Sequence, residues 1–199
     1  MPAKRRALLT AIVIFFCSVI LFSYFYGPTR RTFASRTTVL SVQSTEQVLQ
    51  AWETSGLKGR VAICFTRYLN ALETKESQAA KATELAMNHG IIRKVYHVPP
   101  DSAWGEIQGS LSRRNDMRQT PGGFIGIFDD GRVYITPLSR FTPAPEPALI
   151  LVEPKIWSRD ELLRIAELLS SGRLAADLVI MVRGSDRDAE LFRRALGLQ

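Results

Sequence analysis

One cysteine and one histidine in this chain have side chains suited to nucleophilic chemistry and lie on neighbouring predicted strands. Cys64 with His97 as its base would form a thiolate and imidazole pair, the arrangement that activates a sulfur nucleophile. Such thiols need partly exposed, electropositive surroundings. Cys64 instead stands between an isoleucine and a phenylalanine, so the sequence favours a buried, small apolar role for it.

A second candidate site consists of His97, Asp101 and Ser102. His97 lies near the C-terminal end of a predicted strand, and in open α/β sheets ligands bind at that edge. Asp101 and Ser102 begin the next predicted helix, where backbone N–H groups can hold an anion. The same residue types also serve as ordinary N-caps, and this structural role is the favoured explanation. The cluster is therefore a weak candidate for catalysis or binding.

Other sequence signals for chemistry have simpler explanations. The chain has only two histidines and two cysteines, too few for a typical zinc site, and His89 lies at a predicted helix end where a cation is favourable. Asp129 and Asp130 precede a glycine in a predicted hairpin turn. The phosphate-loop, dinucleotide and serine-hydrolase fingerprints are absent from the sequence. We therefore expect no metal and no cofactor.

The elements that position these residues alternate between helix and strand. Ser44 with Gln47, and Ser158 with Glu161, form capping boxes that mark helix starts. The predicted helices cover residues 44–55, 77–89, 101–113, 158–171 and 185–197. The predicted strands cover residues 60–66, 91–98, 123–128, 132–135, 148–152 and 178–182, with 38–42 as a short edge strand. This order predicts an α/β fold, a layered sandwich whose sheet is mixed because it includes one β-hairpin.

Two segments between these elements are predicted to be loops. Residues 113–123 are polar, and residues 137–147 contain four prolines. The three tryptophans, Trp52, Trp104 and Trp157, lie near helix ends and are expected to pack in the core.

An uncharged segment of twenty residues, 7–26, predicts a transmembrane helix. Twenty helical residues rise about 30 Å, the thickness of the hydrocarbon core. Tyrosines gather at its C-terminal end, and Gly27 and Pro28 follow. The resulting organisation is a basic tail (1–6), a transmembrane helix (7–26), a linker (27–43) and an α/β domain (44–199).

Two alternatives to a membrane anchor stay open. A cleaved signal peptide would have a shorter apolar region and small residues at its cleavage site, whereas this segment ends in bulky aromatics. A buried core helix is the second alternative, and it is less favoured because the segment is apolar all round. Three basic residues precede the segment and three follow it, so the number of positive charges is equal on the two sides. The orientation then depends on which basic residues lie nearest to the helix. Lys4, Arg5 and Arg6 abut the helix, which favours a cytoplasmic N-terminus and an extracytoplasmic or lumenal C-terminal domain.

Six of the seven formal positive charges lie in residues 1–43, and the domain 44–199 carries the remaining +1. Six of the 26 basic residues lie in residues 1–43, which contain no Asp or Glu, so residues 44–199 hold the other 20 against all 19 acidic residues. A nucleic-acid-binding domain normally carries an excess of basic residues. We therefore expect membrane lipid and proteins as partners, and no nucleic acid.

Two functions from different classes are consistent with the sequence. The first is a single-pass protein of an inner or internal membrane, of bacterial type, whose domain is a non-catalytic assembly, scaffolding or interaction component. The second is a membrane-tethered hydrolase or transferase, or a small-ligand sensor, with its site at the strand ends near His97. The missing catalytic motifs favour the first.

Overall fold

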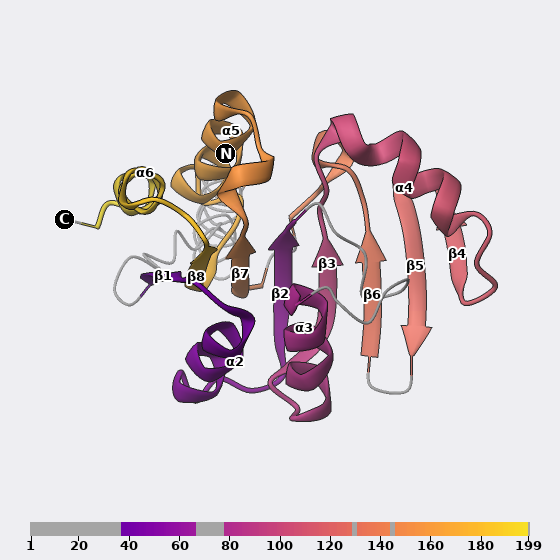
Figure 1. Ribbon diagram of the computed structural model, residues 1–199, viewed down its shortest axis with the longest axis horizontal. Coiled ribbons are helices and arrows are strands. Elements are labelled where there is room, and N and C mark those ends of the chain that lie inside the picture. The colour runs from indigo at the N-terminus through magenta and orange to yellow at the C-terminus, as the bar shows by residue number, and fades with distance from the viewer. Residues whose placement is uncertain (1–36, 67–77, 129–130, 144–145, 199) are drawn as a thin grey trace, which may run out of the picture. The chain divides into compact units, whose positions relative to one another are not determined.

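The computed structural model of the chain describes residues 37–66, 78–128, 131–143 and 146–198 (Figure 1). All of them belong to one compact unit. Within these ranges no helix is long and apolar enough to cross a membrane. The segment 7–26, for which the sequence predicts a transmembrane helix, lies outside the described residues, as do the basic tail, most of the linker, Asp129 and Asp130. The anchor therefore stays a prediction.

Helices and strands alternate along the domain, as predicted. The strands are β1 (Thr38–Val42), β2 (Arg60–Phe65), β3 (Ile92–His97), β4 (Met117–Thr120), β5 (Gly123–Phe128), β6 (Gly131–Ile135), β7 (Ala148–Val152) and β8 (Ala176–Val182). The α-helices are α2 (Thr45–Thr54), α3 (Gln78–Asn88), α4 (Trp104–Leu111), α5 (Arg159–Ser170) and α6 (Asp186–Ala195). Short 3₁₀ turns are η2 (Asp101–Ala103), η3 (Leu138–Arg140) and η4 (Pro154–Ile156).

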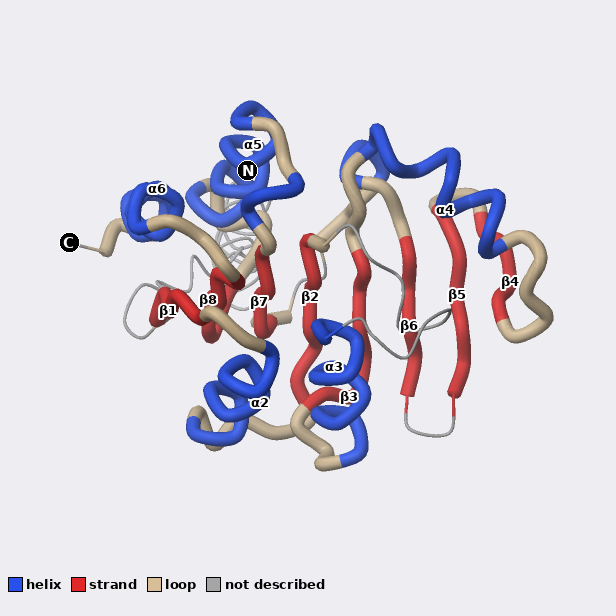
Figure 2. Tube along the Cα trace, viewed as in Figure 1, coloured by secondary structure: helices blue, strands red, loops and turns tan. Residues whose placement is uncertain are grey.

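One mixed sheet of eight strands runs through the domain in the order β1-β8-β7-β2-β3-β6-β5-β4 (Figure 2). The strands from β1 across to β6 are parallel, and β5 and β4 add antiparallel pairs. From β2 the chain proceeds to β3 on one side, and from β7 it proceeds to β8 on the other. The strand order therefore reverses between β2 and β7, where ligands bind in many open α/β sheets.

Two layers of helices cover the sheet. Helices α2 and α3 enclose one cluster of buried side chains, which includes Trp52, and α4 covers a smaller cluster over β4, β5 and β6 on the same face. Helices α5 and α6 cover β7, β8 and β2 on the opposite face, in a cluster that includes Trp157. Trp104 is half-buried and packs against Phe124 at 6.1 Å between ring centroids. The predicted α/β sandwich is confirmed.

Helix starts follow the serine signals in the sequence. Both predicted capping boxes are present, at Ser44 before α2 and at Ser158 before α5. A third box forms at Ser185, whose side chain accepts a hydrogen bond from the backbone N–H of Asp188. Each box satisfies N–H groups that a helix otherwise leaves without partners.

Two local predictions are wrong. Residues 113–123 were predicted to be a loop but contain β4, a polar edge strand whose only buried side chain is Met117. Its backbone pairs with β5, and its side chains carry no apolar alternation for the sequence to reveal. The helix predicted from residue 101 or 102 begins instead at Trp104, after the 3₁₀ turn η2, and no side chain caps it.

Candidate functional site

The two candidate nucleophilic residues lie opposite each other in the sheet. Cys64 on β2 is in register with His97 on β3, and both strands direct these positions toward the face covered by α2 and α3. Cys64 is 1% exposed and His97 is 5% exposed. Cys64 is thus buried, as its apolar neighbours in the sequence indicate.

Burial opposes charge on both side chains. Desolvation raises the pKa of the Cys64 thiol to about 12 and lowers the pKa of His97 to about 4. Near neutral pH the pair is therefore a thiol and a neutral imidazole, whereas nucleophilic sulfur chemistry uses the thiolate. This environment favours a packing role for Cys64.

Polar atoms nevertheless gather around the point where the strand order reverses. The backbone N–H of Glu153 donates to the carbonyl of Phe65 at 3.1 Å, which joins the ends of β7 and β2. On the adjoining strand ends, the buried Thr66 Oγ1 and His97 Nδ1 form no hydrogen bond with any described residue. Desolvation also raises the pKa of the half-buried Glu153, partly opposed by the charge of Arg183. A buried polar atom that forms no hydrogen bond is costly, so these atoms are candidates for binding a ligand or a water molecule.

Asp101 and Ser102 take a different role from the one predicted. Both are exposed in η2, and Asp101 Oδ1 accepts hydrogen bonds from the backbone N–H of Ser139 at 3.0 Å and from its hydroxyl at 2.7 Å. Asp101 therefore fixes η3 beside the end of β3 and does not cap α4. The Ser102 side chain forms no hydrogen bond with another residue of the described ranges.

Metal chemistry has no obvious centre in the described part of the chain. No group of three His, Cys, Asp or Glu side chains lies close enough there to hold a metal ion. His89, which the sequence places at a helix end, pairs through Nδ1 with Glu53 Oε1 at 3.0 Å and so connects the end of α3 to α2.

The most distinctive surface is one that sequence reasoning missed. On the face of the sheet opposite α3, β3 carries Lys94 and Tyr96, and β6 carries Arg132 and Tyr134. Lys94 is in register with Arg132, and Tyr96 is in register with Tyr134. Helices α5 and α6 cover this face of the sheet over β7 and β8, but none of the described helices packs over β3, β6, β5 and β4 here.

An aromatic pair forms the centre of this surface. The rings of Tyr96 and Tyr134 stack at 4.9 Å between centroids with an interplanar angle of 22°. Lys94 Nζ lies 4.8 Å from both ring centroids, within the range of a cation–π interaction. Phe141 meets Tyr96 edge-on at 6.1 Å and closes the side toward α5. The tyrosines are thus held in a fixed arrangement while staying partly exposed.

The surface continues over the antiparallel strands. Ile125 lies in register with Tyr134, and Ile127 with Arg132. Ile127 is 71% exposed, an unusual value for a large apolar strand residue. Arg118 on β4 lies in register with Ile125. We call this surface the open face; its residues are Lys94, Tyr96, Arg118, Ile125, Ile127, Arg132 and Tyr134.

The open face is cationic. None of its three basic side chains, Lys94, Arg118 and Arg132, forms an ion pair with a carboxylate of the described residues. Most other strand positions in this sheet are apolar and buried. The alternation of apolar residues with lysine, arginine and tyrosine along residues 92–97 and 132–135 was the signal for this surface. The same alternation is typical of any half-buried strand, so on its own it does not indicate a binding surface.

Comparison of the chain with protein-family models, with curated proteins and with solved structures found no match in any of the three.

Proposed function

We propose that this chain is a membrane-tethered interaction protein whose α/β domain is a non-catalytic assembly or scaffolding component. Residues 7–26 supply the anchor, and the open face supplies the surface that binds a partner protein. The single observation that carries the proposal is a sheet face that no described helix covers. It holds two stacked tyrosines, the exposed Ile127 beside the partly buried Ile125, and three basic residues that form no ion pair with a described carboxylate.

The composition of the open face supports protein binding. Tyrosine and arginine are enriched at protein interfaces, and they dominate the residues whose truncation weakens binding. The stacked pair Tyr96 and Tyr134 is already ordered by Lys94, so binding costs less conformational entropy than it would for mobile side chains. A rigid aromatic centre with charges around it therefore favours a specific contact.

The partner surface should be acidic with an apolar centre. Three cations attract carboxylates and steer association, while Ile125 and Ile127 lose water only against apolar groups. An anionic lipid surface would attract the three cations as an acidic protein surface would. It offers no fixed surface against which the paired tyrosine rings could pack. We therefore propose a protein partner and treat lipid binding as an outcome of the test.

The test is site-specific photocrosslinking of the full chain in its native membranes. A photoreactive residue replaces Ile127 on the open face, and a second variant carries it at Leu163, which is 44% exposed on α5. We expect the Ile127 position to give one protein adduct, whose sequenced crosslink lies in an acidic surface. Adducts to lipid alone, or equal adducts at both positions, would overturn the proposal.

Charge reversal supplies a matched control. Lys94→Glu and Arg132→Glu should each weaken the Ile127 crosslink about tenfold, because a repulsive charge replaces an attractive one. Arg164→Glu makes the same charge change on α5 and should leave the crosslink unchanged. The crosslink should also weaken as salt rises, because ions screen exposed charges.

The proposed location is an inner or internal membrane of bacterial type, with the N-terminus cytoplasmic and the domain extracytoplasmic or lumenal. Reporters fused after Gln199 test the orientation. Alkaline phosphatase should be active and a fluorescent protein that folds only in the cytoplasm should be dark. The reverse pattern would show a cytoplasmic domain.

A second candidate function is a small-ligand sensor, or a hydrolase or transferase, with its site at the strand ends. It is favoured by Thr66 Oγ1 and His97 Nδ1, buried atoms that form no hydrogen bond with the described residues. A ligand that hydrogen-bonds to both atoms would remove their unfavourable burial. Native mass spectrometry of the full chain should then show a bound small molecule that the His97→Leu variant loses. The absence of a bound small molecule from the wild-type chain, or equal binding to both proteins, would contradict this candidate.

A further inference from the structure

The edge strand β1 leaves part of its backbone free. Among the described strands it pairs only with β8, and the N–H of Arg183 donates to the carbonyl of Val42 at 2.8 Å. In a parallel ladder alternate residues direct both backbone groups to the same neighbour. Thr38, Leu40 and Val42 therefore bond toward β8, and Val39 and Ser41 direct their N–H and C=O groups outward. No described residue bonds to these four groups.

The two edges of the sheet differ in their protection. Exposed edges usually carry lysine, proline, other charges or a bulge, which discourage pairing with another chain. The outer strand β4 is four residues long and carries Arg118. The five residues of β1, from Thr38 to Val42, include no charge and no proline, and two of them are β-branched valines. This edge is therefore built to accept another strand.

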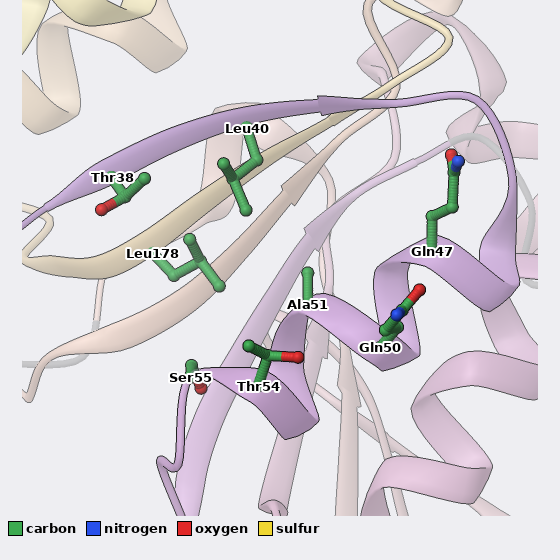
Figure 3. Close-up of a pocket in the computed structure, with 8 residues that line it drawn as sticks. All are labelled: Thr38, Leu40, Gln47, Gln50, Ala51, Thr54, Ser55 and Leu178. Atoms are coloured by element: carbon green, nitrogen blue, oxygen red, sulfur yellow. The ribbon is translucent and has the colours of Figure 1, made fainter.

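A groove lies beside β1 on the face that α2 covers (Figure 3). Its volume is about 380 Å³, and its walls include Leu40 of β1, Leu178 of β8, and Gln47, Gln50 and Thr54 of α2. None of the residues lining it is charged. Leu40 is 36% exposed, which makes it one of the few large apolar side chains left at the surface. An added strand would place its side chains against this groove.

We infer that the strand added here is β1 of a second copy of the chain, in an antiparallel pair about a two-fold axis at Leu40. Val39 of each copy then faces Ser41 of the other, and these two pairs exchange four N–H···O bonds. Leu40 faces Leu40 of the second copy in a non-hydrogen-bonded pair, with Cα atoms about 4.5 Å apart. This pattern uses the outward backbone groups and no others.

The side chains suit this symmetric pair. Antiparallel pairing about Leu40 places uncharged residues opposite uncharged residues at every position, so no like charges meet. Both Leu40 side chains lie on the α2 face, where each covers the other at the mouth of its groove. A two-fold pair is also the commonest way in which identical chains associate. A strand of another protein would need uncharged residues at these positions and an apolar residue opposite Leu40, whereas β1 of a second copy already has both.

A disulfide across the axis tests the pairing directly. In the full chain carrying Cys17→Ala, Leu40→Cys places two thiols opposite each other, at a Cβ separation of about 5 Å. Arg118→Cys makes the matched change on β4. We expect mild oxidation to crosslink the Leu40→Cys protein into a dimer at least about tenfold faster than the Arg118→Cys protein. Equal rates, or disulfides to a different protein, would overturn the inference.

Ser41→Pro tests the hydrogen bonds. Proline removes an N–H that points away from β8, so the fold keeps its internal ladder while each dimer loses two donors. The dissociation constant of the dimer, measured by analytical ultracentrifugation in detergent, should rise roughly tenfold or more, and Ser41→Ala should leave it unchanged. Unchanged circular dichroism would exclude misfolding, and a monomeric wild-type chain would overturn the inference.

The open face and the β1 edge are separate surfaces, so their tests fail separately. Loss of dimers in Ser41→Pro with an intact Ile127 photocrosslink would support both proposals. A wild-type chain that gives the partner crosslink without any dimer would overturn only the inference about β1.

Discussion

Cys64 and His97 lie opposite each other on adjacent parallel strands, and both side chains are buried under α2 and α3. Desolvation keeps both side chains neutral near pH 7, since it disfavours the charged form of each. The pair therefore resembles a catalytic arrangement in its spacing but not in its electrostatics.

The first prediction concerns the reactivity of Cys64. In a Cys17→Ala background, Cys64 should react with Ellman's reagent only as the domain unfolds, because the folded thiol is buried and its pKa is raised to about 12. Absorbance of the released thiolate, measured against denaturant concentration, checks this. Rapid labelling of the native domain at neutral pH would contradict it and would revive the nucleophile hypothesis.

The second prediction concerns acid stability. His97 has a pKa of about 4 when folded and about 6.5 when unfolded, so the unfolded chain binds the extra proton between these values. The contribution of neutral His97 to the free energy of unfolding is therefore fully present above pH 6.5. It is lost as the pH falls to about 4, a change of about 3 kcal/mol. Denaturant titrations at several pH values should show a shallower pH dependence for His97→Leu than for wild type.

The control for this titration is His89→Gln, which changes the exposed histidine and keeps the buried one. It should retain the wild-type loss of stability between pH 6.5 and 4. Identical pH profiles for His97→Leu and wild type would show that His97 is not the group responsible.

The third prediction concerns two adjacent glycines, Gly122 just before β5 and Gly123 as its first residue. A Cβ on Gly123 would lie 1.9 Å from the backbone oxygen of Ile135, whereas a Cβ on Gly122 would meet nothing within 4 Å. Gly123→Ala should lower the free energy of unfolding by roughly 3 kcal/mol or more, because β5 and β6 must separate to admit the methyl group. Gly122→Ala should change it by less than about 0.5 kcal/mol. Thermal unfolding monitored by circular dichroism measures both.

The fourth prediction separates a helix cap from an exposed serine. Ser158 accepts a hydrogen bond from the N–H of Glu161 and begins α5, so Ser158→Ala should cost about 1 kcal/mol of stability. Ser102→Ala changes an exposed residue of η2 that caps no helix and should leave stability unchanged. A comparable cost for both variants in denaturant unfolding would contradict this assignment.

The elements that the sequence predicts best are those with strong local signals. Ser44 and Ser158 fix two helix starts through contacts within one turn, and these local interactions are visible without a fold. The uncharged run Thr38–Val42 was predicted to be an edge strand and is one. The strand β4 escaped prediction because pairing with β5, and not its own composition, makes it a strand.

By itself, the sequence determined the α/β class, most elements and the segregation of positive charge into residues 1–43. These properties depend on local periodicity, capping and residue counts. Only the tertiary structure decided which strands are neighbours, and that decision creates the open face, because Tyr96 and Tyr134 are 38 residues apart and meet only when β3 pairs with β6. The apolar neighbours of Cys64 in the sequence already indicate its burial. Packing from distant elements buries His97 as well and places it in register with Cys64, so these two properties were decided by the fold.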